Sequence, residues 1–245
     1  MRRAAGPVVR VKGLTVRFGS FTAVDKLNLE IGRGEIFGFL GANGAGKTTT
    51  IRILCGLTRP TSGRAEVAGL DLARRSEQVK RSIGYMSQRF ALYEDLKLRE
   101  NLVFYGGLYR LGPQTSLNKA KPYLERFAME RYTDELVREI PPGYKQRLAL
   151  ICALTHDPPV VFLDEPTSGV DPQARREFWS VISDLAASGK TVIVSTHYME
   201  EAEYCHRVLI MRDGISAAQG SPAELKAAHG VGSMQELFLL LASGE

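Results

Sequence analysis

A glycine-rich run early in the chain has the residue types and the spacing of a phosphate-binding loop. Residues 41–49 read GANGAGKTT, which fits the pattern G-x-x-x-x-G-K-[ST]. Glycines let backbone N–H groups turn inward around phosphate oxygens, and a helix that begins near Lys47 points its positive end at the same oxygens. In this pattern Lys47 reaches the β and γ phosphates, and Thr48 supplies an oxygen ligand for Mg²⁺. The predicted contacts are Gly41, Asn43, Gly44, Ala45, Gly46, Lys47, Thr48 and Thr49.

Two adjacent carboxylates end an apolar run much later in the chain. Residues 160–163 are all apolar, and Asp164 and Glu165 follow them directly. Such a strand could simply end at the solvent, but a buried strand rarely ends in paired acids without a cation or a proton. Together with Lys47, the pair predicts that Asp164 holds Mg²⁺ and that Glu165 polarises an attacking water.

A histidine and a glutamine follow two further predicted strands. His197 comes after the apolar run 191–196, at the end of a strand where open α/β sheets bind their ligands. We therefore predict that His197 senses a terminal phosphate, and we expect the other histidines in loop-like or surface positions. Gln88 follows the predicted strand 83–87, and taken alone it is a surface glutamine. The other histidines are His156, His206 and His229.

The elements that position these side chains are predicted from hydrophobic periodicity. Alternating apolar residues predict antiparallel strands at the start of the chain, and continuous apolar runs predict buried strands. The predicted strands lie within 9–18, 27–31, 35–40, 65–67, 83–87, 160–163, 191–195, 208–211 and 215–218. The predicted helices are 47–55, 172–187 and a short one after His197, and residues 89–155 are predicted to be a helical insertion. This alternation predicts an α/β fold with a mostly parallel sheet.

The same pattern predicts one domain over residues 1–245 with four parts. Residues 1–88 form an antiparallel edge and the phosphate-loop core, and residues 89–155 form the helical subdomain. Residues 156–220 complete the core, and residues 221–245 form a helical tail. The fold class is therefore an α/β P-loop NTPase with a RecA-like core, an antiparallel β edge subdomain and a helical insertion.

Composition excludes several classes of protein. The 245 residues are 44% hydrophobic and 24% charged, as in ordinary globular proteins, and the net charge of +5 is spread along the chain, so no nucleic-acid partner is expected. Apolar runs such as 148–154 fall short of the ~20 residues that cross a bilayer. Residues 1–8 lack a signal-peptide core, which predicts a cytoplasmic protein. The cysteines, expected to be reduced and buried, are Cys55, Cys152 and Cys205.

In this order along the chain, the motifs resemble those of the ATP-binding cassette of ABC transporters. Residues 41–49 match Walker A, Asp164 and Glu165 match Walker B with its catalytic glutamate, and residues 168–171 match the D-loop. The resemblance implies an aromatic contact of Phe18 with adenine, catalytic roles for Lys47, Gln88 of the Q-loop, Glu165 and the switch histidine His197, and Mg²⁺ ligands Thr48, Gln88 and Asp164. It also implies that Gly143, Gln146 and Asp171 contact ATP.

One motif departs from the family. The signature is usually Leu-Ser-Gly-Gly-x-x-Gln, whereas residues 140–146 read IPPGYKQ. Proline fits the first turn of a helix, but Pro141 lacks the serine hydroxyl and neither Pro141 nor Pro142 has an N–H to donate. Of the usual donors the Gly143 amide remains, so we expect a weakened contact with the opposite cassette. Some drug-efflux cassettes resemble this one in having proline at the serine position.

The resemblance implies an ATP hydrolase that pairs with a second cassette, as a homodimer or a heterodimer, and energises a separate membrane-spanning permease. Similarity of the tail to drug-efflux subunits implies export of small hydrophobic or drug-like compounds, with the chain peripheral on the inner face of the cell membrane. We also expect residues 89–105 to form part of the groove in which the permease docks. The alternative is a soluble ABC-type ATPase in assembly or nucleic-acid-linked processes.

Overall fold

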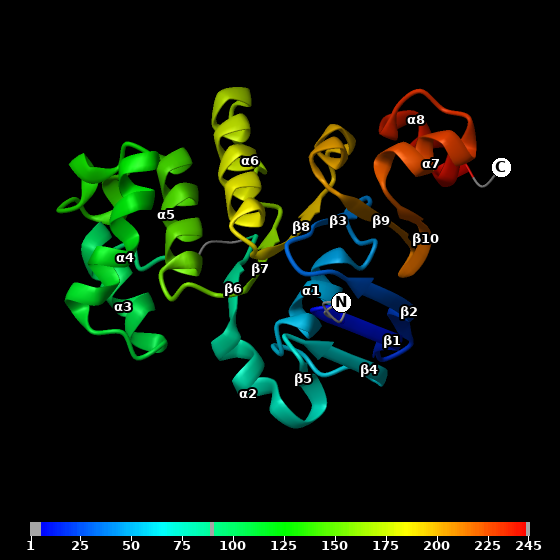
Figure 1. Cartoon of the computed structure of the whole chain (residues 1–245), viewed down its shortest axis with the longest axis horizontal. Helices are drawn as coiled ribbons and strands as arrows, with labels where there is room; N and C mark the ends of the chain where they lie inside the picture. Colours follow the sequence, from blue (N-terminus) through cyan, green and yellow to red (C-terminus); the bar gives the residue numbers. More distant parts are fainter. Residues whose placement is uncertain (1–5, 89–90, 244–245) are drawn as a thin grey trace, which may run out of the picture.

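The computed structural model describes residues 6–88 and 91–243, and it places them in two sheets with helices around them (Figure 1). The smaller sheet is antiparallel, with strand order β2-β1-β4-β5. The larger sheet has six strands in the order β10-β9-β3-β8-β7-β6. The strands are β1 (Val9–Phe18), β2 (Phe21–Ile31), β3 (Ile36–Leu40), β4 (Ser62–Val67), β5 (Leu70–Asp71), β6 (Ile83–Met86), β7 (Val160–Asp164), β8 (Thr191–Thr196), β9 (Arg207–Arg212) and β10 (Ile215–Gly220).

The larger sheet brings the carboxyl ends of three buried strands to one edge. Strands β3, β7 and β8 run parallel and are neighbours in the order β3-β8-β7, and every residue of all three is buried. Burial on both faces explains why their sequences are continuous apolar runs. Because parallel strands end at the same edge, the residues after Leu40, Leu163 and Thr196 emerge close together.

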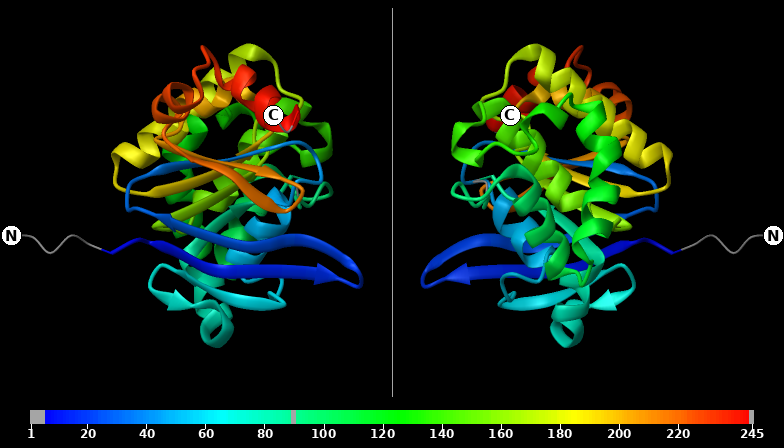
Figure 2. Two further views of the ribbon diagram at one scale, coloured as in Figure 1. Left: turned by 90° about the vertical axis from the view of Figure 1, so that its right-hand side faces the viewer. Right: turned by 90° about the vertical axis from the view of Figure 1, so that its left-hand side faces the viewer.

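Helices cover the larger sheet on both faces. The first helix, α1 (Lys47–Leu54), lies between the two sheets, where it contacts β2, β4 and β7 (Figure 2). On the other side lie α5 (Pro142–Leu154) and α6 (Pro172–Ala187), and α3 (Leu98–Leu108) and α4 (Pro113–Arg126) pack with α5 at one end of the molecule. At the opposite end lie α7 (Pro222–His229) and α8 (Met234–Ser243). Short 3-10 helices are η1 (Glu130–Tyr132), η2 (Val137–Glu139) and η3 (Met199–Tyr204).

The predicted fold class is confirmed, with an antiparallel sheet beside a mostly parallel one and a helical stretch between β6 and β7. The predicted helix 172–187 has the bounds of α6. The helix predicted after residue 197 is the 3-10 helix η3. The antiparallel pairing of β10 with β9 makes the larger sheet mixed. The predicted boundaries of the four parts stay predictions.

One helix was not predicted. Helix α2 (Leu72–Ser82) reads LARRSEQVKRS and buries only Leu72 and Val79, so its apolar signal is too sparse to detect by periodicity. Its start is fixed by Asp71, whose side chain accepts hydrogen bonds from the backbone N–H groups of Ala73 and Arg74.

The remaining predictions on cysteines and hydrophobic length are also addressed by the structure. All three cysteines are buried free thiols, as expected. Across the described ranges, no helix combines the length and the apolar character needed to cross a bilayer. The predicted docking segment 89–105 begins with Arg89 and Phe90, which lie outside the described residues.

Candidate functional site

The phosphate-loop sequence forms a tight turn between β3 and α1 that two of its glycines make possible. Gly41 has φ 152° and Gly46 has φ 102°, conformations that residues with a side chain rarely adopt. A Cβ on Gly41 would lie 2.4 Å from the carbonyl oxygen of Met211, and one on Gly46 would lie 2.6 Å from that of Ala23. The loop is therefore held against two neighbouring backbone segments, which fixes its shape.

Lys47 lies inside this loop with only 4% of its side chain exposed. Its Nζ donates hydrogen bonds to the carbonyl oxygens of Gly41, at 2.7 Å, and Ala42, at 3.0 Å, and lies 3.7 Å from Oε1 of Glu165. Burial lowers the pKa of Lys47, and the neighbouring carboxylates of Glu165 and Asp164 oppose that shift. The ammonium group is thus positioned in a site short of compensating charge on the loop side, which favours an anionic ligand there.

Asp164 ends β7, and its two carboxylate oxygens have different surroundings. Its Oδ1 accepts hydrogen bonds from the hydroxyls of Thr48, at 3.0 Å, and Ser195, at 2.5 Å. Its Oδ2 is buried and has no hydrogen-bond partner among the described residues. Burial raises the pKa of Asp164, while the two hydroxyl donors oppose the rise. A buried carboxylate oxygen beside a threonine hydroxyl fits Mg²⁺, which prefers oxygen ligands.

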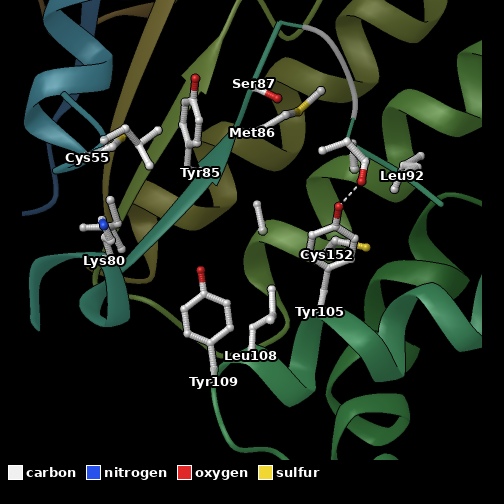
Figure 3. Close-up of a pocket in the computed structure, with 15 residues that line it drawn as sticks. Cys55, Lys80, Tyr85, Met86, Ser87, Leu92, Tyr105, Leu108, Tyr109 and Cys152 are labelled. Atoms are coloured by element: carbon white, nitrogen blue, oxygen red, sulfur yellow. Dashed lines mark hydrogen bonds between the residues drawn. The ribbon is translucent and has the colours of Figure 1, made fainter. Parts of the chain in front are cut away.

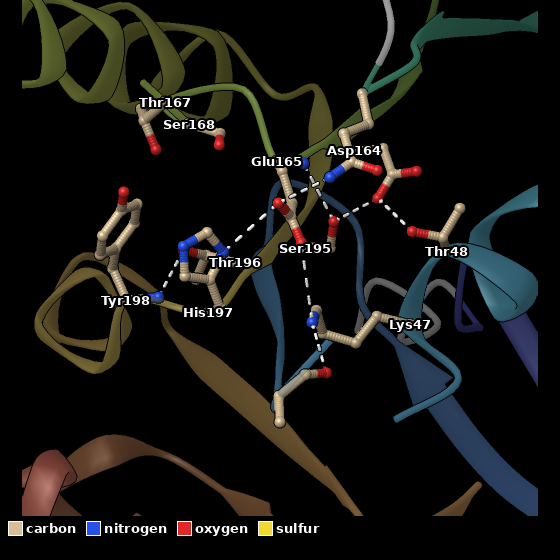
Figure 4. Close-up of polar contacts among 12 residues, drawn as sticks. Lys47, Thr48, Asp164, Glu165, Thr167, Ser168, Ser195, Thr196, His197 and Tyr198 are labelled. Atoms are coloured by element: carbon tan, nitrogen blue, oxygen red, sulfur yellow. Dashed lines mark hydrogen bonds and ion pairs between the residues drawn. The ribbon is translucent and has the colours of Figure 1, made fainter. Parts of the chain in front are cut away.

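Glu165 lies at the centre of the polar cluster (Figure 4). Its Oε2 accepts a hydrogen bond from Nε2 of Gln88 at 3.0 Å and lies 3.3 Å from Nδ1 of His197. Its backbone N–H donates to the carbonyl oxygen of Ser195 at 3.1 Å, and its φ is 52°, which is strained for a residue with a side chain and costs ~1–3 kcal/mol. The neighbouring strand β8 thus supports this conformation, which aims the carboxylate between Lys47, Gln88 and His197.

These groups border an open cavity of about 450 Å³ at the carboxyl edge of the larger sheet. Phe18 and Phe21, which are 55% and 61% exposed, lie at its rim because they face each other across the hairpin between β1 and β2. The sequence analysis singled out Phe18 and missed Phe21; the two-residue spacing of the hairpin turn was the available signal. The lining residues are Phe18, Phe21, Ala23, Asn43, Gly44, Gly46, Lys47, Thr48, Thr49, Gln88 and Glu165.

Three predicted nucleotide contacts from outside the phosphate loop do not line this cavity. Gly143 lies in the first turn of α5, and a Cβ added there would have nothing within 4 Å. Gln146 donates from Nε2 to the carbonyl oxygen of Ser168 at 2.9 Å, and Asp171 caps α6 by accepting from the N–H groups of residues 173 and 174. The structure therefore joins the signature to the predicted D-loop, and their predicted contacts with ATP stay predictions.

One histidine differs from its predicted setting. His156 was expected in a loop-like or surface position, but it is half-buried and its ring stacks on Tyr109 with centroids 3.4 Å apart. Its Nε2 lies 2.9 Å from the carbonyl oxygen of Ile83. His206 and His229 are exposed, as expected. Ser195, which bridges Asp164 and Glu165, was the polar residue that the sequence analysis missed, because it lies inside an apolar strand.

A comparison with protein families places this geometry. Residues 24–168 match the family model described as "ABC transporter". The chain belongs to this family. A second model, described as "AAA domain, putative AbiEii toxin, Type IV TA system", matches residues 138–201 only.

Curated relatives of this ABC transporter chain are named as ATP-binding proteins. It is 48% identical over 220 residues to the probable multidrug ABC transporter ATP-binding protein YbhF of Escherichia coli, covering 90% of this chain and 38% of that protein. It therefore spans well under half the length of that relative. It is 40% identical over 227 residues to the daunorubicin resistance ATP-binding protein DrrA3 of Streptomyces coeruleorubidus, covering 92% of this chain and 72% of that one.

Solved structures agree with the family assignment. The ATP-binding subunit of an ABC transporter is similar with a TM-score of 0.88 and 29% identity, over 96% of this chain and 99% of that one. A dimeric post-hydrolysis state of the ATP-binding cassette MJ0796, bound to ADP and Pi, is similar with a TM-score of 0.80 and 26% identity, over 87% and 98%.

Proposed function

We propose that this chain binds and hydrolyses ATP at the cavity between the phosphate loop and β7, and that hydrolysis energises a separate membrane-spanning permease. The observation that carries the proposal is the position of Glu165, a 6% exposed carboxylate held among Lys47, Gln88 and His197 at the edge of that cavity. A carboxylate so held orients a water for attack on a phosphoryl group.

The side chains divide this work by their chemistry. Lys47 neutralises phosphate charge, and the N–H groups of residues 43–49 at the start of α1 donate to the same oxygens. Phe18 and Phe21 offer exposed aromatic faces on which a base stacks. His197 and Gln88 both contact Oε2 of Glu165, so a terminal phosphate that draws either side chain away changes the position of the carboxylate.

The residues also fit Mg²⁺. Thr48 and Asp164 would hold the ion, because the buried Oδ2 of Asp164 lacks a partner among the described residues and the Thr48 hydroxyl is 3.0 Å from Oδ1. Gln88 would be the third ligand, and its bond to Glu165 would then be exchanged for one to the ion. When bound, Mg²⁺ neutralises charge on the β and γ phosphate oxygens.

We further propose that two cassettes pair around the nucleotide. The cavity is open, and the predicted nucleotide contacts Gly143, Gln146 and Asp171 do not line it, so the second set of contacts has to come from another copy or a related chain. A solved relative, MJ0796, is described as dimeric. The signature and the D-loop are already joined through the Gln146 to Ser168 bond, so they would approach the opposite nucleotide together.

The permease is proposed to dock in a second cavity of about 270 Å³ between the larger sheet and the helical stretch (Figure 3). Tyr85 and Met86 line it, and they lie close in sequence to Gln88, which contacts Glu165. At its mouth Leu57 and Leu108 are 47% and 59% exposed, which is apolar surface that a partner helix would cover. From the predicted docking segment, Leu92 and Tyr105 line this cavity.

The cargo is proposed to be small hydrophobic or drug-like compounds moved outward, with the chain on the inner face of the cell membrane. Support comes from relatives named for multidrug transport, daunorubicin resistance and Nod factor export. The alternative, a soluble ATPase of assembly or nucleic-acid-linked processes, is separated by extraction in mild detergent, because a transport ATPase co-purifies with a membrane protein.

The catalytic assignment is tested with Glu165→Gln, using Lys47→Ala as the matched loss-of-binding variant. Glu165→Gln is expected to bind ATP while turnover falls by at least ~10²-fold, because the amide does not accept a proton from water. It is also expected to accumulate an ATP-dependent dimer in size-exclusion chromatography. Unchanged turnover in Glu165→Gln, with binding lost in Lys47→Ala, would exclude Glu165 as the catalytic carboxylate.

A further inference from the structure

A second buried carboxylate, Glu201, lies on η3 outside the phosphate site. It is 1% exposed, although it belongs to a short helix at the surface of the sheet. Its Oε1 accepts a hydrogen bond from the hydroxyl of Thr167 at 2.6 Å, and Nε of Arg175 lies 3.5 Å from the same oxygen. Its Oε2 has no hydrogen-bond partner among the described residues. A charge buried this deeply is costly unless its contacts hold separate elements together.

The partners of Glu201 come from two different segments. Thr167, which is 1% exposed, belongs to the loop 165–171 that follows β7, and this loop begins with Glu165. Arg175 belongs to the first turns of α6, and its guanidinium also lies over the ring of Tyr198 at 4.2 Å. Glu201 therefore connects the loop after β7, the start of α6 and the segment after β8.

These contacts close a ring around the catalytic carboxylate. On one side, the ring of Tyr198 lies 4.2 Å from that of His197, whose Nδ1 is 3.3 Å from Oε2 of Glu165. On the other side, the Ser168 N–H donates to the carbonyl oxygen of Glu165 at 3.2 Å, directly beside Thr167. Thr167 and Tyr198 are both drawn in Figure 4, one on each segment. The link that joins the two sides away from Glu165 is Glu201.

A second contact fixes η3 on α6 without involving this ring. Trp179, one turn after Arg175 on the same face of α6, stacks on Tyr204 with centroids 5.0 Å apart. Because this stack remains when Glu201 is changed, η3 keeps an anchor, and the specific loss is the connection to the loop 165–171.

We propose that Glu201 is a positioning residue that ties the loop 165–171 to the segment 196–204 and so keeps Glu165 and His197 at their observed spacing. The kinetic part of this inference rests on the proposed function, since it concerns ATP turnover. The mechanical part is independent of it, because the tie is present in the chain without nucleotide.

The mechanical part is tested by hydrogen exchange on the nucleotide-free full chain. Glu201→Leu removes the charge and the acceptor at similar volume and is expected to increase exchange in both 165–171 and 196–204. Thr167→Val removes only the hydroxyl and is expected to increase exchange in 165–171 while 196–204 stays protected through Arg175. Glu200→Leu, at an exposed neighbour on the same helix, is the matched control and is expected to change neither segment.

The kinetic part uses the same variants with ATP. Glu201→Leu is expected to lower kcat about tenfold or more with KM changed less than about twofold, because misplacement of Glu165 affects chemistry and leaves the phosphate loop intact. Glu201→Gln keeps an acceptor for Thr167 and is expected to recover part of kcat. The double variant with Thr167→Val is expected to lose no more than Glu201→Leu alone, since both changes break one link.

The outcomes separate this inference from the proposed function. Increased exchange confined to 196–204 in Glu201→Leu, or a kcat no lower than in Glu200→Leu, would overturn the tie. A wild-type chain without ATP turnover would overturn the proposed function, while the exchange results on 165–171 would still decide whether Glu201 connects the two segments. Thr167→Val removes one hydroxyl at nearly constant volume, so it keeps the test decisive if Glu201→Leu fails to fold.

Discussion

The stability of this chain is expected to fall on mild acidification because of one histidine. The ring of His156 stacks on Tyr109, at the end of α3, with centroids 3.4 Å apart and planes 3° from parallel. Its Nε2 lies 2.9 Å from the carbonyl oxygen of Ile83, the first residue of β6. Burial lowers the pKa of His156 to about 4, although the hydrogen bond to Ile83 opposes the shift.

The sign and the size follow from linkage between protonation and folding. The folded pKa lies below the unfolded value of 6.5, so the unfolded chain takes up the proton first. The stabilising contribution is fully present above pH ~6.5 and is lost as the pH falls toward 4. At ~1.4 kcal/mol per pKa unit the whole effect is about 3 kcal/mol, of which about 2 kcal/mol is lost by pH 5. For a chain of this size that corresponds to a fall in Tm of ~4–8 °C.

The assay is urea unfolding at pH 7.5 and pH 5.0 for the wild type and for His156→Gln, whose amide still donates to the Ile83 carbonyl oxygen but does not titrate. The wild type is expected to lose about 2 kcal/mol more unfolding free energy between the two pH values than His156→Gln does. His229→Gln, at an exposed position on α7, serves as the control and should follow the wild type. Equal losses in wild type and His156→Gln would refute the reasoning.

Two further predictions concern partners. Leu108→Asp, at the mouth of the second cavity, is expected to weaken stimulation of ATP turnover by the permease at least ~5-fold with basal turnover unchanged, because burying an unpaired carboxylate is costly; Leu239→Asp, equally exposed on α8, is the control, and equal effects in reconstituted ATPase assays would contradict the docking proposal. Pro141→Ser with Pro142→Gly is expected to increase the ATP-driven dimer fraction of Glu165→Gln in light scattering, since it restores a hydroxyl and an N–H; an unchanged or lower fraction would contradict the weakened-contact reasoning.

The site residues found from the sequence share one property: each directly follows an apolar strand or stands in a loop with fixed spacing. Asp164 and His197 come at the ends of β7 and β8, and Lys47 belongs to the loop after β3. Because neighbouring parallel strands end at one edge, knowing where each strand stops was enough to bring these residues together. The parallel order β3-β8-β7 is the physical reason that a one-dimensional pattern predicted a three-dimensional cluster.

The residues that were missed act across elements and leave no local pattern. Ser195 reads as one more small residue of a buried strand, yet its hydroxyl connects Asp164 and the backbone of Glu165. Glu201 reads as one of several acids after His197, and only the packing of η3 against α6 buries it. Helix α2 escaped for the related reason that tertiary contacts at two apolar positions, rather than periodicity, determine it.

The two prolines at the start of α5 show how local structure limits chemistry at a site the chain does not complete by itself. Pro141 has φ −56° and ψ 146° and precedes the first helical residue, Pro142, so both adopt the geometry that suits a helix start. The N–H groups of Tyr144 and Lys145 both donate to the carbonyl oxygen of Pro141. Within 141–145, a stretch that the structure describes throughout, the Gly143 N–H is therefore the backbone donor left for an approaching phosphate, which makes the opposite contact depend on how closely a partner brings its nucleotide to that one group.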